Sequence, residues 1–146
     1  GRIVSNLNDV LGSTGGLAIA HNELSTQARD NLVYHLSWDF GRQLAANGSN
    51  GTDHGRGNYS ILIGNPLQGG AYGELFPAHE AQPDPGDSQG RTPFEIPGRD
   101  IKGLTSLEHV WSAHCDWLQA GISGSIFPHA AGAPLEGGVD LSGLYA

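Results

Sequence analysis

Carboxylate, guanidinium and imidazole side chains gather in one glycine-rich stretch of the chain. Asp39 and Arg42 precede a spacer of small and polar residues, and Asp53 and His54 follow it. Carboxylate oxygen and imidazole nitrogen together suit Zn, Mn or Fe, whereas a site made of oxygens alone suits Mg or Ca. Because glycine permits tight backbone turns, the spacer can return Asp53 and His54 toward Asp39. These residue types therefore predict half of the ligand shell of a divalent metal.

The same residues also permit a purely structural interpretation. Asp, Asn and Gly are the ordinary residues of turns, and an Asp-His-Gly triplet often arises by chance. Arg42 on its own is typical of a surface residue held in a salt bridge. The residue types alone therefore leave a metal site and an ordinary turn both open.

Composition limits the classes to which the protein can belong. The 146 residues fit one domain, and 15 acidic against 7 basic residues give a formal net charge of −8. The basic residues are scattered, which argues against a nucleic-acid binder, because such a protein needs clustered Lys and Arg. No apolar run approaches the roughly 18 residues of a membrane span. Cys115 is the single cysteine, so an intrachain disulfide is excluded.

Apolar periodicity predicts a few regular elements separated by long loops. The most regular is a helix near the C-terminal end, where Thr105 and Glu108 form a capping-box pattern and Gly121 is placed to end the helix. Glycine and proline mark the intervening stretches as loops. In chain order, we expect a helix at 3–11 ended by Gly12, a buried strand at 31–36, a loop at 40–58, a buried strand at 59–63, a short edge strand at 69–73 and a proline-rich surface excursion at 77–103.

An ordered set of motifs resembles one known family. Residues 39–42 read D-F-G-R, residues 47–57 read N-G-S-N-G-T-D-H-G-R-G, and after an apolar strand residues 69–73 read G-G-A-Y-G. This order resembles the domain of unknown function 1501 family, and the resemblance spans residues 32–128. The sequence departs from the family at Trp38, where a serine is usual. An upstream D-T-H motif of the family has no counterpart before residue 31.

The resemblance implies a fold and a set of site residues. The family is related to the alkaline phosphatase superfamily, which includes sulfatases and cofactor-independent phosphoglycerate mutases. It implies an α/β fold with a largely parallel sheet flanked by helices, in which Asp39 and His54 ligate divalent metals. Asp53 would ligate a metal or orient His54, and Arg42 would bind an anionic ester oxygen. Phe40 stands where the mutases have a histidine, so one metal site would be weakened or remade.

Two principal hypotheses of function follow from the resemblance. The first is a metal-dependent hydrolase of phosphate or sulfate esters, or the C-terminal portion of one, with a small anionic ester as its substrate. The second is a non-catalytic exported protein that keeps the fold and acts in surface assembly or binding. A third is a carbohydrate-binding surface at Trp38, Tyr72 and Trp111. No catalytic nucleophile is assignable from the sequence.

The resemblance also predicts how the chain is organised and where it acts. Residues 1–129 would form the C-terminal part of an alkaline-phosphatase-like domain, and residues 130–146 would form a Gly- and Ala-rich tail. Another chain or a missing N-terminal segment would complete the sheet. The protein is expected in the periplasm or outside the cell, with no nucleic-acid partner and no transmembrane segment.

Overall fold

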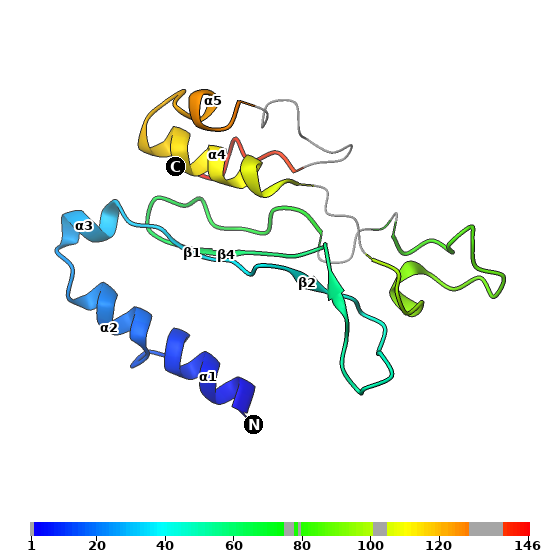
Figure 1. Ribbon diagram of the computed structural model, residues 1–146. Coiled ribbons are helices and arrows are strands. Elements are labelled where there is room, and N and C mark those ends of the chain that lie inside the picture. The colour runs from blue at the N-terminus through cyan, green and yellow to red at the C-terminus, as the bar shows by residue number, and fades with distance from the viewer. Residues whose placement is uncertain (1, 75–77, 79, 101–104, 129–138) are drawn as a thin grey trace. The chain divides into compact units, whose positions relative to one another are not determined.

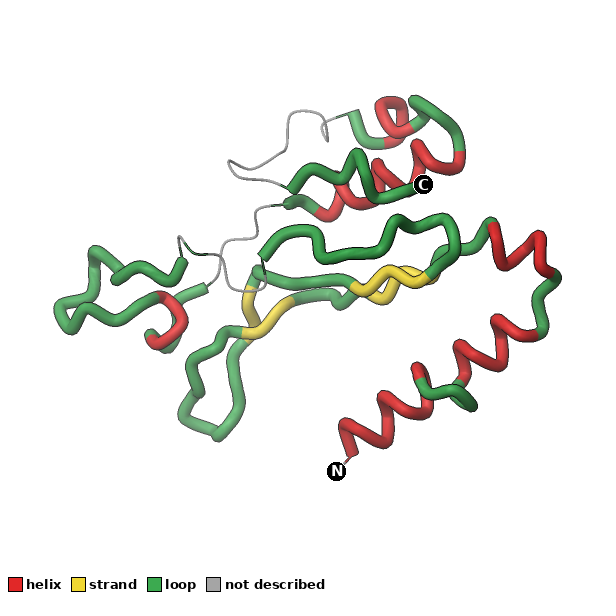
Figure 2. The backbone as a smooth tube through the Cα atoms, turned by 180° about the vertical axis from the view of Figure 1, so that it is seen from behind, coloured by secondary structure: helices red, strands yellow, loops and turns green. Residues whose placement is uncertain are grey.

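The computed structural model describes residues 2–74, 78, 80–100, 105–128 and 139–146. Short helices and strands are joined by long irregular segments (Figures 1 and 2). Two compact units make up the chain: Gly1–His35 with Leu62–Leu67, and Leu36–Ile61 with Gln68–Ala146. The residues expected to form the functional site all belong to the second unit.

Three helices make up most of the first unit. The predicted helix that ends before Gly12 is confirmed, because the Gly12 amide donates to the Asn8 carbonyl at 3.0 Å after the last helical residue. The two helices that follow have no sequence pattern that predicts them. One begins after Gly15, which has no side chain to act as a cap, and the other is five residues long with Ser25 as its N-cap. In chain order these helices are α1 (Arg2–Leu11), α2 (Gly16–Asn22) and α3 (Thr26–Asp30).

Among the described residues, four short strands form two small sheets of two strands each. β1 (Tyr34–Leu36) pairs with β4 (Ile61–Ile63), and β2 (Gly41–Arg42) pairs with β3 (His54–Gly55). In the second sheet the strands are antiparallel, with Gly41 opposite Gly55 and Arg42 opposite His54. Figure 2 shows both pairs in yellow, with the loop of the β2–β3 hairpin in green.

The predicted α/β fold with a largely parallel, alkaline-phosphatase-like sheet is wrong for the part of the chain that the structure describes. Both of its sheets are small and antiparallel. Parallel strands need a crossover connection, which is usually a helix. Residues 37–60, which connect β1 to β4, instead carry the β2–β3 hairpin and no helix. Because a hairpin reverses the direction of the chain, the strands that flank it run antiparallel.

The other predicted strands and loops have mixed outcomes. The apolar runs at 31–36 and 59–63 do contain β1 and β4, although each strand is only three residues long. The predicted burial is wrong for β4, where Ile61 and Ile63 are 39% and 41% exposed, and β1 is only half-buried. The predicted edge strand at 69–73 is wrong, because these residues are irregular and Gly69, Gly70 and Gly73 have positive φ angles that suit turns. The expected loop at 40–58 contains the hairpin strands. Within 77–103, the described residues hold only the short 3₁₀ helix η1 (Pro93–Glu95), as expected for a surface excursion.

The predicted C-terminal helix is confirmed as α4 (Leu107–Leu118), but its cap lies one residue later than expected. Ser106 is the N-cap, and its Oγ accepts the His109 amide at 3.2 Å. Thr105 has a different role, because its Oγ1 accepts the Val139 amide at 3.1 Å. The four-residue helix α5 (Ser123–Ile126) follows α4.

Removing the cap of α4 should weaken the fold by a modest and measurable amount. Ser106→Ala removes the side-chain acceptor of the His109 amide and leaves it only the Ser106 carbonyl at 3.1 Å, so we expect a loss of about 1 kcal/mol in the free energy of unfolding. The measurement is urea unfolding followed by circular dichroism. Ser125→Ala, at an exposed serine of α5, is the matched control and should stay within about 0.5 kcal/mol of the unmodified chain. Equal effects of the two substitutions would contradict the assigned cap.

The C-terminal residues pack closely against α4 in the second unit. Leu144 is 3% exposed and is the one buried hydrophobic residue among those that the structure describes. Tyr145 stacks on Trp117 with ring centroids 4.9 Å apart and planes 4° from parallel, and its hydroxyl hydrogen-bonds His114 Nδ1. Residues 139–146 of the predicted tail therefore pack as irregular chain, and residues 130–138 lie outside the described part.

Large apolar side chains are exposed on several elements. Trp111 of α4 is 40% exposed and meets the His114 ring edge-on. Exposed residues of α1 recur at helical spacing and form one apolar face, comprising Val4, Leu7, Val10 and Leu11. None of the described helices is long and apolar enough to cross a membrane.

Candidate functional site on the β2–β3 hairpin

The β2–β3 hairpin brings Arg42 and His54 together. The two residues are directly opposite in the antiparallel register, and directly opposite side chains lie on the same face of a two-stranded sheet. Phe40 precedes Arg42 by two residues and contacts both of them. Its ring centroid lies 3.9 Å from the His54 ring centroid and 5.2 Å from the Arg42 guanidinium carbon. One face of the hairpin therefore carries a guanidinium and an imidazole on an aromatic ring.

The charge of Arg42 is not neutralised by a carboxylate within the described residues. Its Nη1 donates to the Thr52 carbonyl at 2.9 Å, which holds the side chain across the hairpin. Three other arginines form ion pairs instead, namely Arg56 with Asp100, Arg91 with Asp87 and Arg99 with Asp84. The sequence-based alternative of a salt-bridged Arg42 therefore has no support in the described part of the chain. Its other N–H donors have no acceptor among the described residues, and a guanidinium so placed suits an external anion.

Asp53 lies next to His54 but has a structural partner. Asn47 Nδ2 donates to Asp53 Oδ1 at 2.8 Å, while Asn47 Oδ1 accepts the Ser49 and Gly51 amides at 3.0 and 3.1 Å. The Gln43 amide also donates to the Asp53 carbonyl at 3.0 Å, so the pairing of the hairpin continues past β3. Because successive residues of a strand point to opposite faces, Asp53 and His54 diverge. Asp53 therefore holds the loop of the hairpin, which is the turn role that its residue type permits.

Asp39 is exposed and lies two residues before β2. Its carboxylate has no hydrogen bond or ion pair with any described residue. The ring of His54 is occupied on one side by Phe40. The structure thus brings Arg42 and His54 together, and it does not bring the three predicted ligands Asp39, Asp53 and His54 into one set.

The hairpin as described does not fit a metal ion by itself. Among residues 2–74, 78, 80–100, 105–128 and 139–146, no three His, Cys, Asp or Glu side chains are grouped so that they could hold one. A structural Zn site has four protein ligands and a catalytic one has three. The predicted metal therefore stays a prediction, and a metal at His54 would need further ligands from beyond these residues.

Distant segments fix the hairpin in place, and the sequence pattern does not identify them. The Asp100 carboxylate accepts the Arg56 amide at 2.8 and 2.9 Å and Arg56 Nε at 2.9 Å. Gln43 Oε1 accepts the Gly98 amide at 2.9 Å. Each of these contacts joins residues more than forty positions apart. Local spacing carries no signal for such partners.

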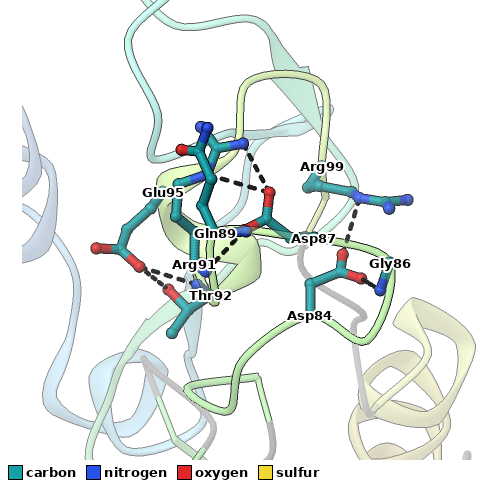
Figure 3. A network of polar contacts seen from close by, with 8 residues as sticks. All are labelled: Asp84, Gly86, Asp87, Gln89, Arg91, Thr92, Glu95 and Arg99. Atoms are coloured by element: carbon teal, nitrogen blue, oxygen red, sulfur yellow. Dashed lines mark hydrogen bonds and ion pairs between the residues drawn. The ribbon is translucent and has the colours of Figure 1, made fainter.

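A second polar cluster, in the proline-rich segment, has an internal structural explanation. Asp87 accepts the amides of Gln89 and Arg91 and also two bonds from the Arg91 guanidinium (Figure 3). Asp84 accepts Arg99 Nε at 2.8 Å. Hydrogen bonding by Arg91 lowers the pKa of Asp87 to about 2. The acidic residues of this loop are thus satisfied within the loop and offer no free ligand set.

The loop of Asp87 should loosen in acid. Its pKa in the folded state, about 2, lies below the ordinary value of 3.8, so its stabilising effect is complete above about pH 4 and is lost as pH falls through about 2. We expect protection of the Gln89 and Arg91 amides against hydrogen exchange to decline over this range. Asp87→Asn should reduce that protection at every pH, whereas Asp39→Asn, at an exposed carboxylate, should not change it. Protection that stays constant down to pH 2 would contradict the bonding in Figure 3.

Neither a scan against protein-family models nor searches of curated proteins and of solved structures found a match. The functional argument therefore depends on the chemistry of the hairpin itself.

Proposed function

We propose that this chain contributes the anion-binding part of a hydrolase of phosphate or sulfate esters. The observation that carries the proposal is the Arg42–His54 pair, which lies on one face of the hairpin with no carboxylate among the described residues to neutralise it. Phosphate and sulfate groups present planar pairs of oxygens, and a guanidinium matches such pairs with two parallel N–H donors. The motif resemblance of residues 39–57 to a family related to phosphatases and sulfatases supports the same substrate class.

The residues of the hairpin have distinct roles in this proposal. Arg42 binds the anionic oxygens and is held in place through its bond to the Thr52 carbonyl. Phe40 supports both the guanidinium and the imidazole. His54 presents a ring nitrogen that can donate to an ester oxygen when protonated. The nucleophile remains unassigned, because Ser49 and Thr52 belong to the hairpin loop and match no nucleophile motif.

Metal dependence is a separate part of the proposal, and it is based on the residue types and the family resemblance of the sequence. A divalent metal in such an enzyme polarises the ester oxygen and stabilises developing charge. The described residues do not form its ligand set. The residue types suit Zn, Mn or Fe, or else Mg or Ca, and elemental analysis of the purified protein distinguishes these metals.

The test is hydrolysis of aryl phosphate and aryl sulfate monoesters by the full chain, assayed with each metal. We expect turnover with one ester class and a drop of about tenfold to a hundredfold in kcat/KM for Arg42→Gln, because an ionic hydrogen bond to the reacting group is lost. Arg2→Gln, on exposed α1, changes the net charge equally and should leave kcat/KM unchanged. Absence of turnover under all conditions, or equal rates for the two variants, would refute the proposal.

A second candidate function is non-catalytic assembly of an exported protein in the periplasm or at the cell surface. The exposed apolar face of α1 favours it, with Leu7 at 52% exposure. Light scattering after size exclusion tests it: we expect a self-associated chain that dissociates on Leu7→Asp and not on Ser5→Asp, which lies on the opposite side of the helix. A monomer at all concentrations would exclude self-assembly through this face.

A further inference from the structure

Two exposed aromatic residues, Trp38 and Tyr59, lie on the segments that lead into and out of the β2–β3 hairpin. Trp38 and Tyr59 are 47% and 60% exposed, and their ring centroids lie 5.4 Å apart with planes at 53°. Asn58 ties the two arms together here, because its Nδ2 donates to the Trp38 carbonyl at 3.0 Å and its Oδ1 accepts the Tyr59 amide at 2.8 Å. The Asn58 side chain thus joins the backbone at the two exposed aromatic residues.

Trp38, Phe40 and Arg42 occupy alternate positions of one arm of the hairpin. The four backbone steps from Trp38 to Arg42 span at most about 13 Å, so both residues lie within the length of one short oligosaccharide. Phe40 lies between them in the sequence, and its ring contacts both the Arg42 guanidinium and the His54 imidazole. This segment therefore carries aromatic rings at one end and, at the other, a cation that no carboxylate of the described residues neutralises.

The chemistry of this row favours a saccharide over other ligands. The face of an aromatic ring is negative and attracts the polarised C–H groups of a pyranose, while indole N–H and phenol O–H remain able to hydrogen-bond sugar hydroxyls. Single-stranded nucleic acid also stacks on aromatic rings, but it needs a positively charged groove along its backbone. The formal net charge of −8 opposes any polyanion. A short saccharide with a single anionic group offers sugar faces to the aromatic rings and one negative charge to Arg42, and it avoids the repulsion that a polyanion would meet.

We propose that the row Trp38, Phe40, Arg42, His54 and Tyr59, called here the hairpin platform, binds an oligosaccharide that carries one anionic substituent. The sugar stacks on Trp38 and Tyr59, and the substituent binds Arg42. This inference deepens the proposed function, and rests on it in assigning an ester anion to Arg42. It names the substrate class as an anionic saccharide ester.

The test is binding of the full chain to an array of oligosaccharides in neutral, O-sulfated, O-phosphorylated and uronate forms of the same backbones. We expect retention of at least one anionic form, at least tenfold tighter than its neutral counterpart. The preferred form then distinguishes sulfate, phosphate and carboxylate as the anion. Retention of no glycan, or equal retention of charged and neutral forms, would overturn the proposal.

Variants separate the two ends of the platform. Trp38→Ala should abolish retention of every glycan, Trp38→Phe should restore most of it, and Arg42→Gln should reduce the anionic forms to the level of the neutral ones. Arg2→Gln is the control for charge. Circular dichroism of each variant checks that a loss of glycan retention does not come from unfolding. Loss of glycan retention in Arg2→Gln would also contradict the proposal.

The outcome for the platform can be separated from the outcome for the hydrolase. Ester hydrolysis without glycan retention would leave the proposed function standing and remove the platform. Glycan retention without hydrolysis of any ester would do the reverse, and would make the hairpin a binding surface of a non-catalytic protein.

Discussion

Gly41→Ala should disrupt the β2–β3 hairpin and with it anion binding. A Cβ atom on residue 41 would lie 1.5 Å from the Gly57 carbonyl oxygen and 2.6 Å from its carbonyl carbon. Backbone atoms cannot be displaced as a flexible side chain can, so the two arms must separate. We expect a loss of roughly 3 kcal/mol in the free energy of unfolding, at the upper end of the range for overpacked sites.

The measurement is urea unfolding, combined with amide exchange at Arg42 and Gln43. Gly48→Ala is the matched control, because Gly48 lies in the loop of the same hairpin and a Cβ atom added there would have no atom within 4 Å. That substitution should change stability by no more than about 0.5 kcal/mol. A tolerated Gly41→Ala would show that the arms do not approach as closely as described.

Tyr145→Ala should cause the second large loss of stability. Tyr145 stacks on Trp117 and hydrogen-bonds buried His114 through its hydroxyl. Burial raises the pKa of Tyr145 to about 12, so its hydroxyl stays protonated at neutral pH. Removing the ring leaves a gap beside α4, and substitutions of this kind cost about 3 to 5 kcal/mol.

Tyr145→Phe divides this loss between the ring and the hydroxyl. The phenylalanine keeps the stacking on Trp117 and removes only the bond to His114, for which we expect about 1 kcal/mol. Tryptophan fluorescence during urea unfolding reports both variants. Equal losses for Phe and Ala would show that the hydroxyl bond, and not the stacking, holds the C-terminal residues against α4.

Elements with strong local patterns are the ones that the sequence predicts correctly. The regular apolar spacing of α1 and α4 identifies both helices, and Gly12 marks the end of the first. The cap of α4 is displaced by one residue because Ser106 and Thr105 are both suitable cap residues. Thr105 is instead recruited by the Val139 amide, a partner that is distant in the sequence.

The error in fold class arises from the connection between β1 and β4. Apolar runs indicate that strands exist, but they do not show in which direction neighbouring strands run. The composition of the glycine-rich segment between them is typical of a loop, yet Gly41 and Gly55 sit opposite each other in a hairpin. That pairing sets the antiparallel direction, and it is visible only once the two arms are brought together.

The candidate site is predictable in its location and only partly in its chemistry. The sequence indicates the segment that holds Arg42 and His54, and the family resemblance predicts, without a test so far, that Arg42 binds an anion. It does not show that Asn47 engages Asp53 or that Phe40 lies against His54. Face alternation in the hairpin separates neighbouring Asp53 and His54, which a linear motif presents as a pair.

Titration of the isotope-labelled full chain with phenyl phosphate and with phenyl sulfate, followed by nuclear magnetic resonance, tests the central claim most directly. The account predicts saturable shifts of the Arg42, Thr52 and His54 amides with at least one ester. These shifts should be absent in Arg42→Gln and unchanged in Arg2→Gln. Saturable shifts that persist in Arg42→Gln, or no shift at the hairpin with either ester, would contradict the claim that Arg42 binds the anion.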